Sequence, residues 1–468
     1  MNARQLVVIG GGPGGYPAAF LAADLGMKVT MIDQEPNPGG VCLYRGCIPS
    51  KALLHAAAIL NEAREGSKLG ITFDEPKLDL EKMRTWKNSV VQKLTGGLGQ
   101  LRTQRNIEFI QGRARFTSSS TLKIERKDGG TEDMTFEKAI LASGSRPAVI
   151  PGLPASPRVW DSTGALNLET VPSSLLVVGG GYIGLELGSV YATLGTKVTV
   201  VEMMPSLLPG ADADLVRPLA KRMEKLLAAV LLGTKVVEMK EVANGIEVRF
   251  DGANVKEPIQ VFDRVLVSVG RKPNSQDLGL ETTKVQVDAK GFVTVDPQRR
   301  TADPNIFAIG DVAGEPMLAH KATHEGRVAV EAIAGKKTIF DPRAIPAVVF
   351  TAPEIAWCGI TEAEAQKAGR TVKIARFPWG ASGRATTLNL VDGVTKLIVD
   401  PETERVLGLG LAGPGAGEMI AEGVLAIEMG ATATDLALTI HPHPTLSETI
   451  MESAEVFLGH CTHIYRRK

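Results

Sequence analysis

Two stretches of the chain repeat one pattern of apolar and polar positions. The first stretch begins at Leu6 and the second at Leu175. In each, a short run of valine, leucine and isoleucine is followed by glycines, by a helical segment, and by a second β-branched run that ends in an acid. Short apolar runs that end in glycine are typical of buried strands. Each stretch therefore predicts a strand, a glycine turn, a helix and a second strand, repeated within one chain.

The glycines of both stretches follow the spacing G-x-G-x-x-G. They are Gly10, Gly12 and Gly15 in the first stretch and Gly179, Gly181 and Gly184 in the second. In such a turn the first glycine allows the tight bend, the second lets the backbone approach a pyrophosphate, and the third brings the helix close to the strand. The helix N-terminus then offers N–H groups to the phosphates. A single motif is weak evidence in a chain with 50 glycines, but its context favours a dinucleotide site over a βαβ unit that binds none.

The acid at the end of each repeat supports the same interpretation. Asp33 lies 23 residues after Gly10, and Glu202 lies 23 residues after Gly179. An acid roughly 20 residues past the first glycine can accept hydrogen bonds from an adenosine ribose. Glu202 would also repel a 2′-phosphate, and residues 203–205 contain no arginine that could bind one. The second repeat therefore predicts NAD rather than NADP.

Weaker patterns divide the rest of the chain. Residues 90–117 predict a helix followed by strands, and residues 139–144 predict a strand that ends in a glycine turn. The prolines and glycine of residues 151–154 are typical of a linker. A strand at 306–309 leads into a long helical stretch over 310–333. Strands and helices then alternate to the end of the chain without a further nucleotide fingerprint.

These patterns predict an α/β protein of several domains, and 468 residues suffice for about three or four. Two Rossmann-like dinucleotide-binding domains would span residues 1–150 and 151–275. A central region would follow at 276–345, and a separate α+β domain at 346–468.

Composition and charge exclude several classes of function. Lys plus Arg and Asp plus Glu number 52 each, so no net field would attract nucleic acid or an anionic membrane. No apolar run approaches the roughly 18 to 20 residues of a membrane span. The first predicted strand lies so close to Met1 that we expect no signal or transit segment. Four cysteines are too few for a secreted disulfide scaffold, which indicates a soluble protein of the reducing cytoplasm.

A cysteine pair follows the first acid, within residues 39–51. Loops at the carboxyl ends of strands surround the cofactor in such folds, so Cys42 and Cys47 should lie beside the first nucleotide. Pro49 indicates that a helix begins near Cys47, whose thiol pKa would fall beside the positive helix N-terminus. The alternatives are packing cysteines or half of a metal site. Because the C-x₄-C spacing is wide and the other two cysteines, Cys358 and Cys461, form no second pair, we favour a redox-active disulfide and no metal.

A candidate base lies near the end of the chain, in the segment HPHPTLSE. His443 is held between prolines, and Glu448 could bind its second ring nitrogen and stabilise the charged imidazole. A lone histidine is more often structural, and His441 keeps that interpretation.

The first fingerprint, GGVCLYRGCIPSK, the second fingerprint, FAIGD and HPHPTLSE together closely resemble the dihydrolipoamide (dihydrolipoyl) dehydrogenase family, class I pyridine-nucleotide disulfide oxidoreductases. The resemblance covers nearly the whole chain. It implies FAD on the first fingerprint, NAD on the second, and a homodimer formed by the C-terminal domain. It also implies a partner that carries lipoyl groups: the acyltransferase of a 2-oxoacid dehydrogenase complex or the carrier of the glycine cleavage system.

The resemblance assigns roles to single residues. Cys42 would exchange with dihydrolipoamide and Cys47 would lie against the flavin. His443, oriented by Glu448, would act as base from the other subunit. Lys51 and Glu186 would pair near the flavin, where a fixed positive charge stabilises the reduced ring. A solvated lysine and a surface glutamate are the ordinary alternative for that pair.

Two sets of cofactor residues follow from the same resemblance. The FAD set is Gly10, Gly12, Gly15, Asp33, Gly39, Gly40, Lys51, Ala114, Gly144, Asp311 and Ala319. The NAD set is Gly179, Gly180, Gly181, Tyr182, Ile183, Gly184, Glu202, Val236, Gly270 and Arg271.

The implied reaction is a ping-pong cycle in which dihydrolipoamide reduces the disulfide, electrons pass from Cys47 to FAD, and a hydride passes to NAD. Three departures from the commoner family pattern are Pro17, Tyr44 and Ser143, of which Tyr44 is expected to change rates near the disulfide. The alternatives are a glutathione- or mercuric-reductase-like enzyme, a flavin transhydrogenase, and a non-catalytic nucleotide-binding scaffold.

Overall fold

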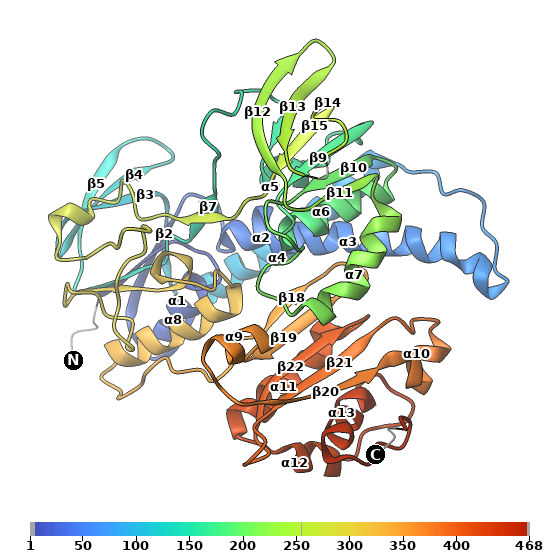
Figure 1. Ribbon diagram of the computed structural model, residues 1–468. Helices are drawn as coiled ribbons and strands as arrows, with labels where there is room; N and C mark the ends of the chain where they lie inside the picture. The colour runs from blue at the N-terminus through green and yellow to red at the C-terminus, as the bar shows by residue number, and fades with distance from the viewer. Residues whose placement is uncertain (1–4, 254, 466–468) are drawn as a thin grey trace.

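The computed structural model describes residues 5–253 and 255–465. A seven-stranded sheet in the order β17-β6-β1-β2-β3-β4-β5 carries the first glycine turn (Figure 1). Its strands are β1 (Gln5–Ile9), β2 (Lys28–Asp33), β3 (Glu108–Ser118), β4 (Thr121–Arg126), β5 (Thr131–Thr135), β6 (Lys138–Leu141) and β17 (Ile306–Ala308). The pairs from β17 to β3 are parallel, and β3, β4 and β5 pair antiparallel. The expected parallel nucleotide-binding sheet is therefore present.

Both faces of this sheet are covered, as a parallel sheet requires. Leu6 and Val8 of β1 pack into a core with helices α1 (Gly15–Asp24) and α8 (Ala319–Ile333). Val7 and Ile9 point to the other face, into a core beneath β3 and β4. Pro17 lies in the first turn of α1, where a proline displaces no intrahelical bond.

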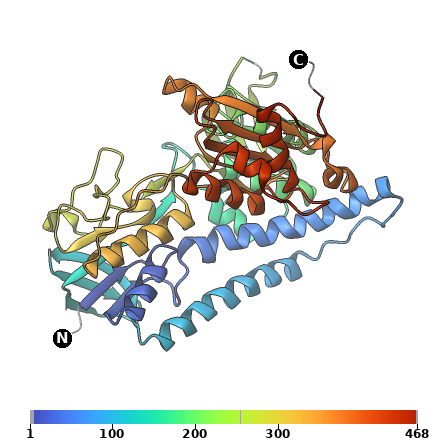
Figure 2. The same cartoon turned by 90° about the horizontal axis from the view of Figure 1, so that it is seen from below.

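Two long helices extend from the first sheet as an antiparallel pair, drawn in blue in Figure 2. Short helix α2 (Gly40–Arg45) leads into α3 (Cys47–Glu65), a 3-10 turn η1 (Gly66–Leu69) and α4 (Leu80–Gln104). The helix start expected near Cys47 is confirmed. Helix α4 begins ahead of the expected position because Asp79 caps it, accepting a bond from the Lys82 N–H at 3.0 Å.

The second glycine turn lies in a five-stranded parallel sheet, in the order β11-β10-β9-β15-β8. Its strands are β8 (Val159–Trp160), β9 (Ser174–Val178), β10 (Lys197–Val201), β11 (Ala229–Leu231) and β15 (Arg264–Val267). The helices beside it are α5 (Ser162–Asn167), α6 (Tyr182–Thr193) and α7 (Ala213–Leu226). An antiparallel sheet of β12 (Lys235–Val242), β13 (Gly245–Asp251) and β14 (Ile259–Phe262) packs on its other side. Strands β7 (Ser145–Pro147) and β16 (Arg271–Pro273) pair where the chain crosses between the two nucleotide units.

The segment after β16 returns to the first sheet, where β17 pairs with β6. It also contains a 3-10 turn, η2 (Leu280–Thr282). The expected continuous helix over 310–333 is wrong. A short 3-10 turn, η3 (Gly310–Ala313), ends before Gly314, whose φ of +138° lies outside the helical region, and α8 starts only at Ala319.

The last part of the chain is an antiparallel sheet in the order β18-β19-β22-β21-β20, flanked by helices. The strands are β18 (Ala347–Val349), β19 (Ile355–Gly359), β20 (Lys373–Pro378), β21 (Val394–Val399) and β22 (Val406–Ala412). The helical elements are α9 (Glu362–Lys367), η4 (Trp379–Ala381), α10 (Gly383–Thr387), α11 (Ala416–Met429), α12 (Ala433–Leu438) and α13 (Glu448–Leu458). Among the described residues of this part, the strongly exposed side chains include Leu425, Met429, Leu438, Ile440 and Tyr465.

One buried core joins three parts of the molecule. It includes residues of α3, of the second nucleotide unit and of the C-terminal sheet, among them Leu53, Leu185 and Ile355. Helix α3, the second nucleotide unit and the C-terminal sheet are therefore packed directly against one another. Within the described residues, no helix is long and apolar enough to cross a membrane.

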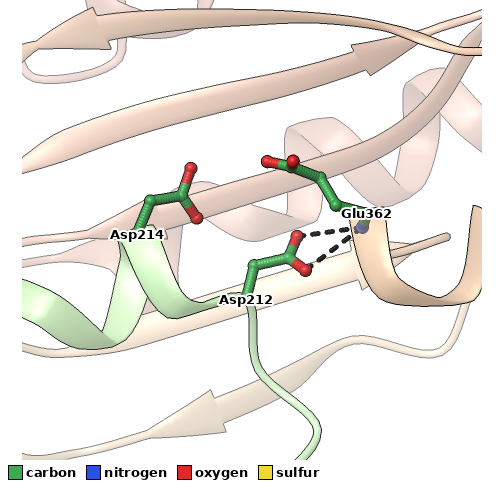
Figure 3. A group of neighbouring side chains, drawn as sticks. All are labelled: Asp212, Asp214 and Glu362. Carbon is green, nitrogen blue, oxygen red and sulfur yellow. Dashed lines mark hydrogen bonds between the residues drawn. The ribbon is translucent and has the colours of Figure 1, made fainter. Parts of the chain in front are cut away.

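A charged cluster fixes the second nucleotide unit to the C-terminal sheet (Figure 3). Asp212 and Asp214, at the start of α7, face Glu362 of α9, and both Asp212 oxygens accept from the Glu362 N–H at 3.1 Å. The three carboxylates lie close enough to hold a cation. The ammonium of Lys396, a side chain only 1% exposed, contacts all three, and Arg376 binds two of them. Protein cations therefore already balance this cluster, which is an ion-pair network.

Candidate active site

A large cavity lies where the first glycine turn, the cysteine helix and the second nucleotide unit meet. Its volume of about 790 Å³ is within the range of ligand sites. Fifteen of the sequence-predicted site residues line it: Gly10, Gly12, Asp33, Gly40, Cys42, Cys47, Lys51, Ala114, Gly144, Tyr182, Ile183, Glu186, Arg271, Asp311 and Ala319. The structure thus brings together residues that lie far apart in the sequence, from Gly10 to Ala319.

The other predicted residues do not line this cavity. Two belong to the FAD set: Gly15 and Gly39. Seven belong to the NAD set: Gly179, Gly180, Gly181, Gly184, Glu202, Val236 and Gly270. The candidate base His443 and its partner Glu448 are also absent from its wall, which, among the described residues, contains none beyond Ala322.

The first glycine turn brings the backbone close to the cavity. A Cβ on Gly40, whose φ is +57°, would lie 2.5 Å from the Gly12 Cα, so these two glycines allow α2 to approach the turn. A Cβ on Gly15 would lie 1.8 Å from the Gly10 carbonyl oxygen, which explains why Gly15 packs behind the turn instead of lining the cavity. The side-chain-free wall and the N-terminus of α1 fit the phosphates of a dinucleotide.

The two acids hold their glycine turns in the same way. Asp33 accepts from the N–H of Gly11 at 2.5 Å and of Glu35 at 2.8 Å. Glu202 accepts from the N–H of Gly180 at 2.7 Å and of Met204 at 2.7 Å. Burial raises the pKa of Asp33, against these backbone bonds that lower it. Each carboxylate therefore fixes its turn and keeps lone pairs that could accept from a ribose.

The second turn also leaves an open face. A Cβ built on Gly181 would meet nothing within 4 Å, whereas one on Gly184 would lie 2.2 Å from the Gly179 carbonyl oxygen. The middle glycine thus faces free space and the last one packs helix α6 on its strand, as the fingerprint requires. This geometry fits a second dinucleotide.

The side chains of Cys42 and Cys47 are in hydrogen-bonding contact, and both are free thiols in this structure. Their proton affinities differ strongly. The bond from Cys42 lowers the pKa of Cys47 to about 7, burial opposes it, and the Lys51 charge adds to the lowering. The bond to Cys47, with burial, raises the pKa of Cys42. The expected lowering at Cys47 is confirmed, although its first cause is the second thiol rather than the helix end.

The other two cysteines lie elsewhere. Cys358 is buried in the C-terminal core, and burial raises its pKa to about 12. Cys461 packs at the edge of the same core. Neither thiol lines the cavity, which agrees with a structural interpretation.

Lys51 and Glu186 form a close ion pair at the cavity wall. The Lys51 Nζ lies 2.8 Å from the Glu186 Oε2, and the Glu186 side chain is only 3% exposed. Two further donors hold this carboxylate: the Ser50 hydroxyl at 3.1 Å and the Phe350 N–H at 3.0 Å. The ordinary alternative of a surface glutamate is therefore wrong, and one ammonium stands fixed one turn along α3 from Cys47.

Asp311 is held at the cavity by residues that the sequence did not reveal. The Ser145 hydroxyl donates to Asp311 and accepts from the Arg271 Nε at 2.7 Å. Fully buried Glu325 of α8 accepts from the Gly310 N–H at 2.6 Å, just before Asp311. Ser145 directly follows the glycine turn expected at 139–144 and Glu325 lies within the expected helix, so no local signal marked either residue. Arg271, assigned to the NAD set, meets the same cavity as the FAD residues.

His443 and Glu448 form the predicted pair in the C-terminal domain. The His443 Nδ1 lies 2.9 Å from the Glu448 Oε1, and the other Glu448 oxygen accepts from the Thr445 N–H at 2.8 Å. Burial opposes the charge on Glu448, but the Thr445 and His443 bonds lower its pKa. The His443 side chain is 75% exposed, so its free nitrogen faces outward. His441 instead has both ring nitrogens engaged, with Glu422 and the Thr439 carbonyl, as expected of a structural histidine.

Tyr44, the departure in the cysteine loop, is tied to the loop that precedes it. Its hydroxyl accepts from the Asn37 N–H and donates to the Asn37 carbonyl, each at 3.2 Å. The hydroxyl thus ties α2 to the loop before it, and the effect of Tyr44 on rates stays a prediction.

The chain matches the models of a known protein family over most of its length. The family model of the pyridine nucleotide-disulphide oxidoreductases matches residues 4–326, and that of their dimerisation domain matches residues 345–454. Because these matches cover most of the chain, the protein belongs to the pyridine nucleotide-disulphide oxidoreductases. Enzymes of this family use FAD and NAD(H), in agreement with the two glycine turns.

Within this family, the chain is similar over its full length to proteins named dihydrolipoyl dehydrogenase. The dihydrolipoyl dehydrogenase of Vibrio cholerae is 48% identical over 465 residues, which cover 99% of this chain and 98% of that protein. The dihydrolipoyl dehydrogenase of Thermus scotoductus is 46% identical over 470 residues and is covered completely, as is this chain.

Two solved structures have the same fold. LpdA from Mycobacterium tuberculosis superposes with a TM-score of 0.90 at 27% identity, covering 97% of this chain and 99% of that one. The Cu(II) complex of the HOCl-induced flavoprotein disulfide reductase RclA from Escherichia coli gives 0.86 at 30% identity, again covering 97% and 99%.

Proposed function

We propose that the chain oxidises protein-bound dihydrolipoyl groups to lipoyl groups and reduces NAD⁺ to NADH. The observation that carries the proposal is the dithiol of Cys42 and Cys47, set in the wall of a dinucleotide cavity beside the Lys51–Glu186 pair. Full-length relatives that bear the name dihydrolipoyl dehydrogenase support the same reaction.

The thiol chemistry begins from the oxidised Cys42–Cys47 pair. A substrate thiolate attacks the Cys42 sulfur, the bond between the two cysteines breaks, and Cys47 leaves as a thiolate. The second substrate thiolate then attacks the substrate sulfur of the mixed disulfide and releases Cys42. The substrate loses two electrons and the cysteine pair gains them. The low pKa of Cys47 suits it to leave, because a weakly basic thiol is the better leaving group.

We assign the residues that surround this chemistry as the resemblance implies. FAD would lie on the first glycine turn with Asp33 and Asp311, and NAD on the second turn with Glu202. Bound FAD supplies the two-electron carrier between the dithiol and NAD⁺. The ammonium of Lys51 would stabilise negative charge that develops beside it. The domain division at residues 150, 275 and 345 belongs to the same proposal.

We further propose that His443 acts on the cavity of a second subunit. The dimerisation-domain match supports a homodimer, and the exposed apolar side chains Leu425, Met429 and Ile440 give the domain a surface for it. Within the described part of one chain, no residue after Ala322 lines the cavity, so a base from the C-terminal domain would come from the partner. It would take the proton from the attacking substrate thiol while Glu448 stabilises the imidazolium.

The partner would be a lipoylated acyltransferase of a 2-oxoacid dehydrogenase complex, or the lipoylated carrier of the glycine cleavage system. A cytoplasmic location, predicted from the cysteine usage, belongs to the same proposal.

Anaerobic titration tests the reaction directly. We expect dihydrolipoamide to reduce the yellow holoenzyme and NAD⁺ to reoxidise it, with NADH appearing in equal amount. NADPH and oxidised glutathione serve as the comparison pair. Turnover of that pair, without turnover of dihydrolipoamide, would assign the chain to a glutathione-reductase-like activity instead.

The base is tested by His443→Gln, with His441→Gln as the matched control. We expect His443→Gln to lower kcat for dihydrolipoamide by roughly 10²- to 10⁴-fold, the usual contribution of a general base. Flavin content should stay unchanged, because His443 does not touch the cavity of its own chain. His441→Gln should retain most of the activity, and full activity in His443→Gln would remove His443 from the mechanism.

A further inference from the structure

Phe350 contacts both members of the ion pair at the cavity wall. Its backbone N–H donates to the Glu186 Oε1 at 3.0 Å, and the Lys51 Nζ lies 4.4 Å from the centre of its ring. The main chain of Phe350 thus holds the carboxylate while its side chain holds the ammonium. Neither Phe350 nor this double contact entered the sequence-predicted site.

The ring supplies a restraint that Glu186 alone does not give. The Lys51 side chain is 33% exposed, and a lysine stem has several rotatable bonds, so one ion pair leaves the ammonium free to swing into the cavity. An aromatic face attracts a cation placed within about 6 Å of its centre. Carboxylate and ring together confine the ammonium from two sides.

The ring of Phe350 lies beside the first turn of α11 in the C-terminal domain. A Cβ on Gly417, in the first turn of α11, would lie 2.9 Å from Val348 and 3.6 Å from the Phe350 Cε1. The Gly417 N–H is itself bound by the Glu354 carboxylate at 2.9 Å. Phe350 follows directly on β18, so the pairing of β18 with β19 holds the start of its backbone in the sheet of that domain.

We propose that Phe350 is a positioning residue for the Lys51 ammonium, holding it against Glu186 and near Cys47. The inference rests on the proposed function for its kinetic consequence, but its electrostatic consequence does not depend on the identity of the substrate. When the ring is lost, the ammonium spends less time beside Cys47 and beside the flavin site. Both the thiolate of Cys47 and a reduced, negatively charged flavin then lose stabilisation.

Phe350→Leu removes the ring and keeps the backbone N–H that binds Glu186. We expect the pH midpoint for alkylation of Cys47 in the reduced enzyme to rise, and the flavin midpoint potential to become more negative. In the dihydrolipoamide assay kcat should fall roughly 3- to 30-fold, the factor that corresponds to one partly buried cation–π contact. The KM for NAD⁺ should stay unchanged.

Two controls separate positioning from packing. Phe350→Tyr keeps an aromatic face and should restore the alkylation midpoint and the potential. Phe109→Leu removes a comparable ring from β3, one that lies 4.8 Å from the Arg102 guanidinium, and should leave both readouts unchanged. Replacement of Phe350 by pentafluorophenylalanine keeps shape and bulk while reversing the ring's electrostatics, so it tests the contact even where the leucine variant folds poorly.

The outcomes are distinct. A fluorinated or leucine variant that loses thermal stability but keeps the wild-type midpoint and potential would reduce Phe350 to a packing residue. A wild-type enzyme that does not oxidise dihydrolipoamide would overturn the proposed function, while the shift of the Cys47 midpoint would still support or refute the role of Phe350.

Discussion

Cys42 and Cys47 lie five positions apart, yet their surroundings shift the pKa values of the two thiols in opposite directions. Cys47 begins helix α3, accepts a bond from Cys42, and has the Lys51 charge one turn away. Cys42 donates that bond and is partly buried, which raises its pKa. When the pair is reduced, the negative charge therefore lies on Cys47 and the proton on Cys42.

This asymmetry predicts the pH dependence of the reduced enzyme. The pKa of Cys47 is lowered from 9.0 to about 7, so its thiolate is present above about pH 7 and is lost as the pH falls below that value. Iodoacetamide alkylation, followed by mass spectrometry of the Cys47 peptide, should show this midpoint. Lys51→Met should move the midpoint upward, because it removes a nearby positive charge.

The matched control is Lys68→Met, since the Lys68 side chain is 59% exposed and lies in the turn that follows α3. It should leave the midpoint in place. A midpoint near 9 in the unmodified enzyme would contradict the assigned asymmetry.

At the scale of elements, the glycine turn depends on two backbones that nearly touch. Gly40→Ala would place a Cβ 2.5 Å from the Gly12 Cα and force an L-residue to a φ of +57°. We expect α2 to move away from the turn and the purified protein to lose most of its flavin, as measured by the ratio of flavin to protein absorbance.

Gly70→Ala isolates the effect of backbone strain. Gly70 has a φ of +81°, and a Cβ added there would meet nothing within 4 Å. The substitution should cost about 1–2 kcal/mol of folding stability and leave the flavin content unchanged. Equal flavin loss in both variants would show that strain alone, rather than contact with Gly12, explains the effect.

Some of the secondary-structure elements could be predicted from the sequence and others could not. The two nucleotide units were predictable because each is local: the strand, turn, helix and acid lie within one short stretch, so spacing carries the geometry. The expected helix ran through Gly314 and Pro316, although both residue types commonly end helices, and the structure interrupts the helix at that point.

Contacts between distant segments left no local signal. Ser145 approaches Asp311 and Phe350 approaches Lys51 only after the sheets have packed. Neither residue type is diagnostic by itself, because serine and phenylalanine occur throughout ordinary protein structure without any role in a site. His443 became a candidate because two prolines and Glu448 surround it in the sequence and because the family resemblance assigns it the role of base, but its relation to the cavity stays a proposal.

At the scale of the molecule, the ion-pair network around Lys396 joins the second nucleotide unit to the C-terminal sheet. Its Nζ lies 2.7 Å from Asp212 and 3.0 Å from Asp214 and also contacts Glu362. Burial would raise the pKa of Asp214, but the bonds from Arg376 and Lys396 lower it, so the carboxylate stays ionised. Removal of the ammonium would take away the cation that pairs with the buried Asp212 side chain, because Arg376 contacts Asp214 and Glu362 but not Asp212.

Lys396→Met should therefore destabilise the chain by about 3–5 kcal/mol, the usual cost of breaking a buried ion pair from one side. Denaturant unfolding followed by tryptophan fluorescence would measure it. The control, Lys221→Met on helix α7, breaks an exposed pair with Asp392 and should change stability by less than about 1 kcal/mol. Equal losses in the two variants would contradict the network's role.

Helix α3 carries the backbones of both Cys47 and Lys51. Cys47 and Lys51 both lie in its first turns, on one continuous rod of 19 residues, whereas Glu186 and Phe350 arrive from two other parts of the molecule. When those parts move against one another, the backbones of Cys47 and Lys51 keep their spacing on α3, while the ammonium follows the carboxylate and the ring that hold it. The distance between the Cys47 sulfur and this positive charge therefore depends on how firmly three separate parts of the chain stay packed together.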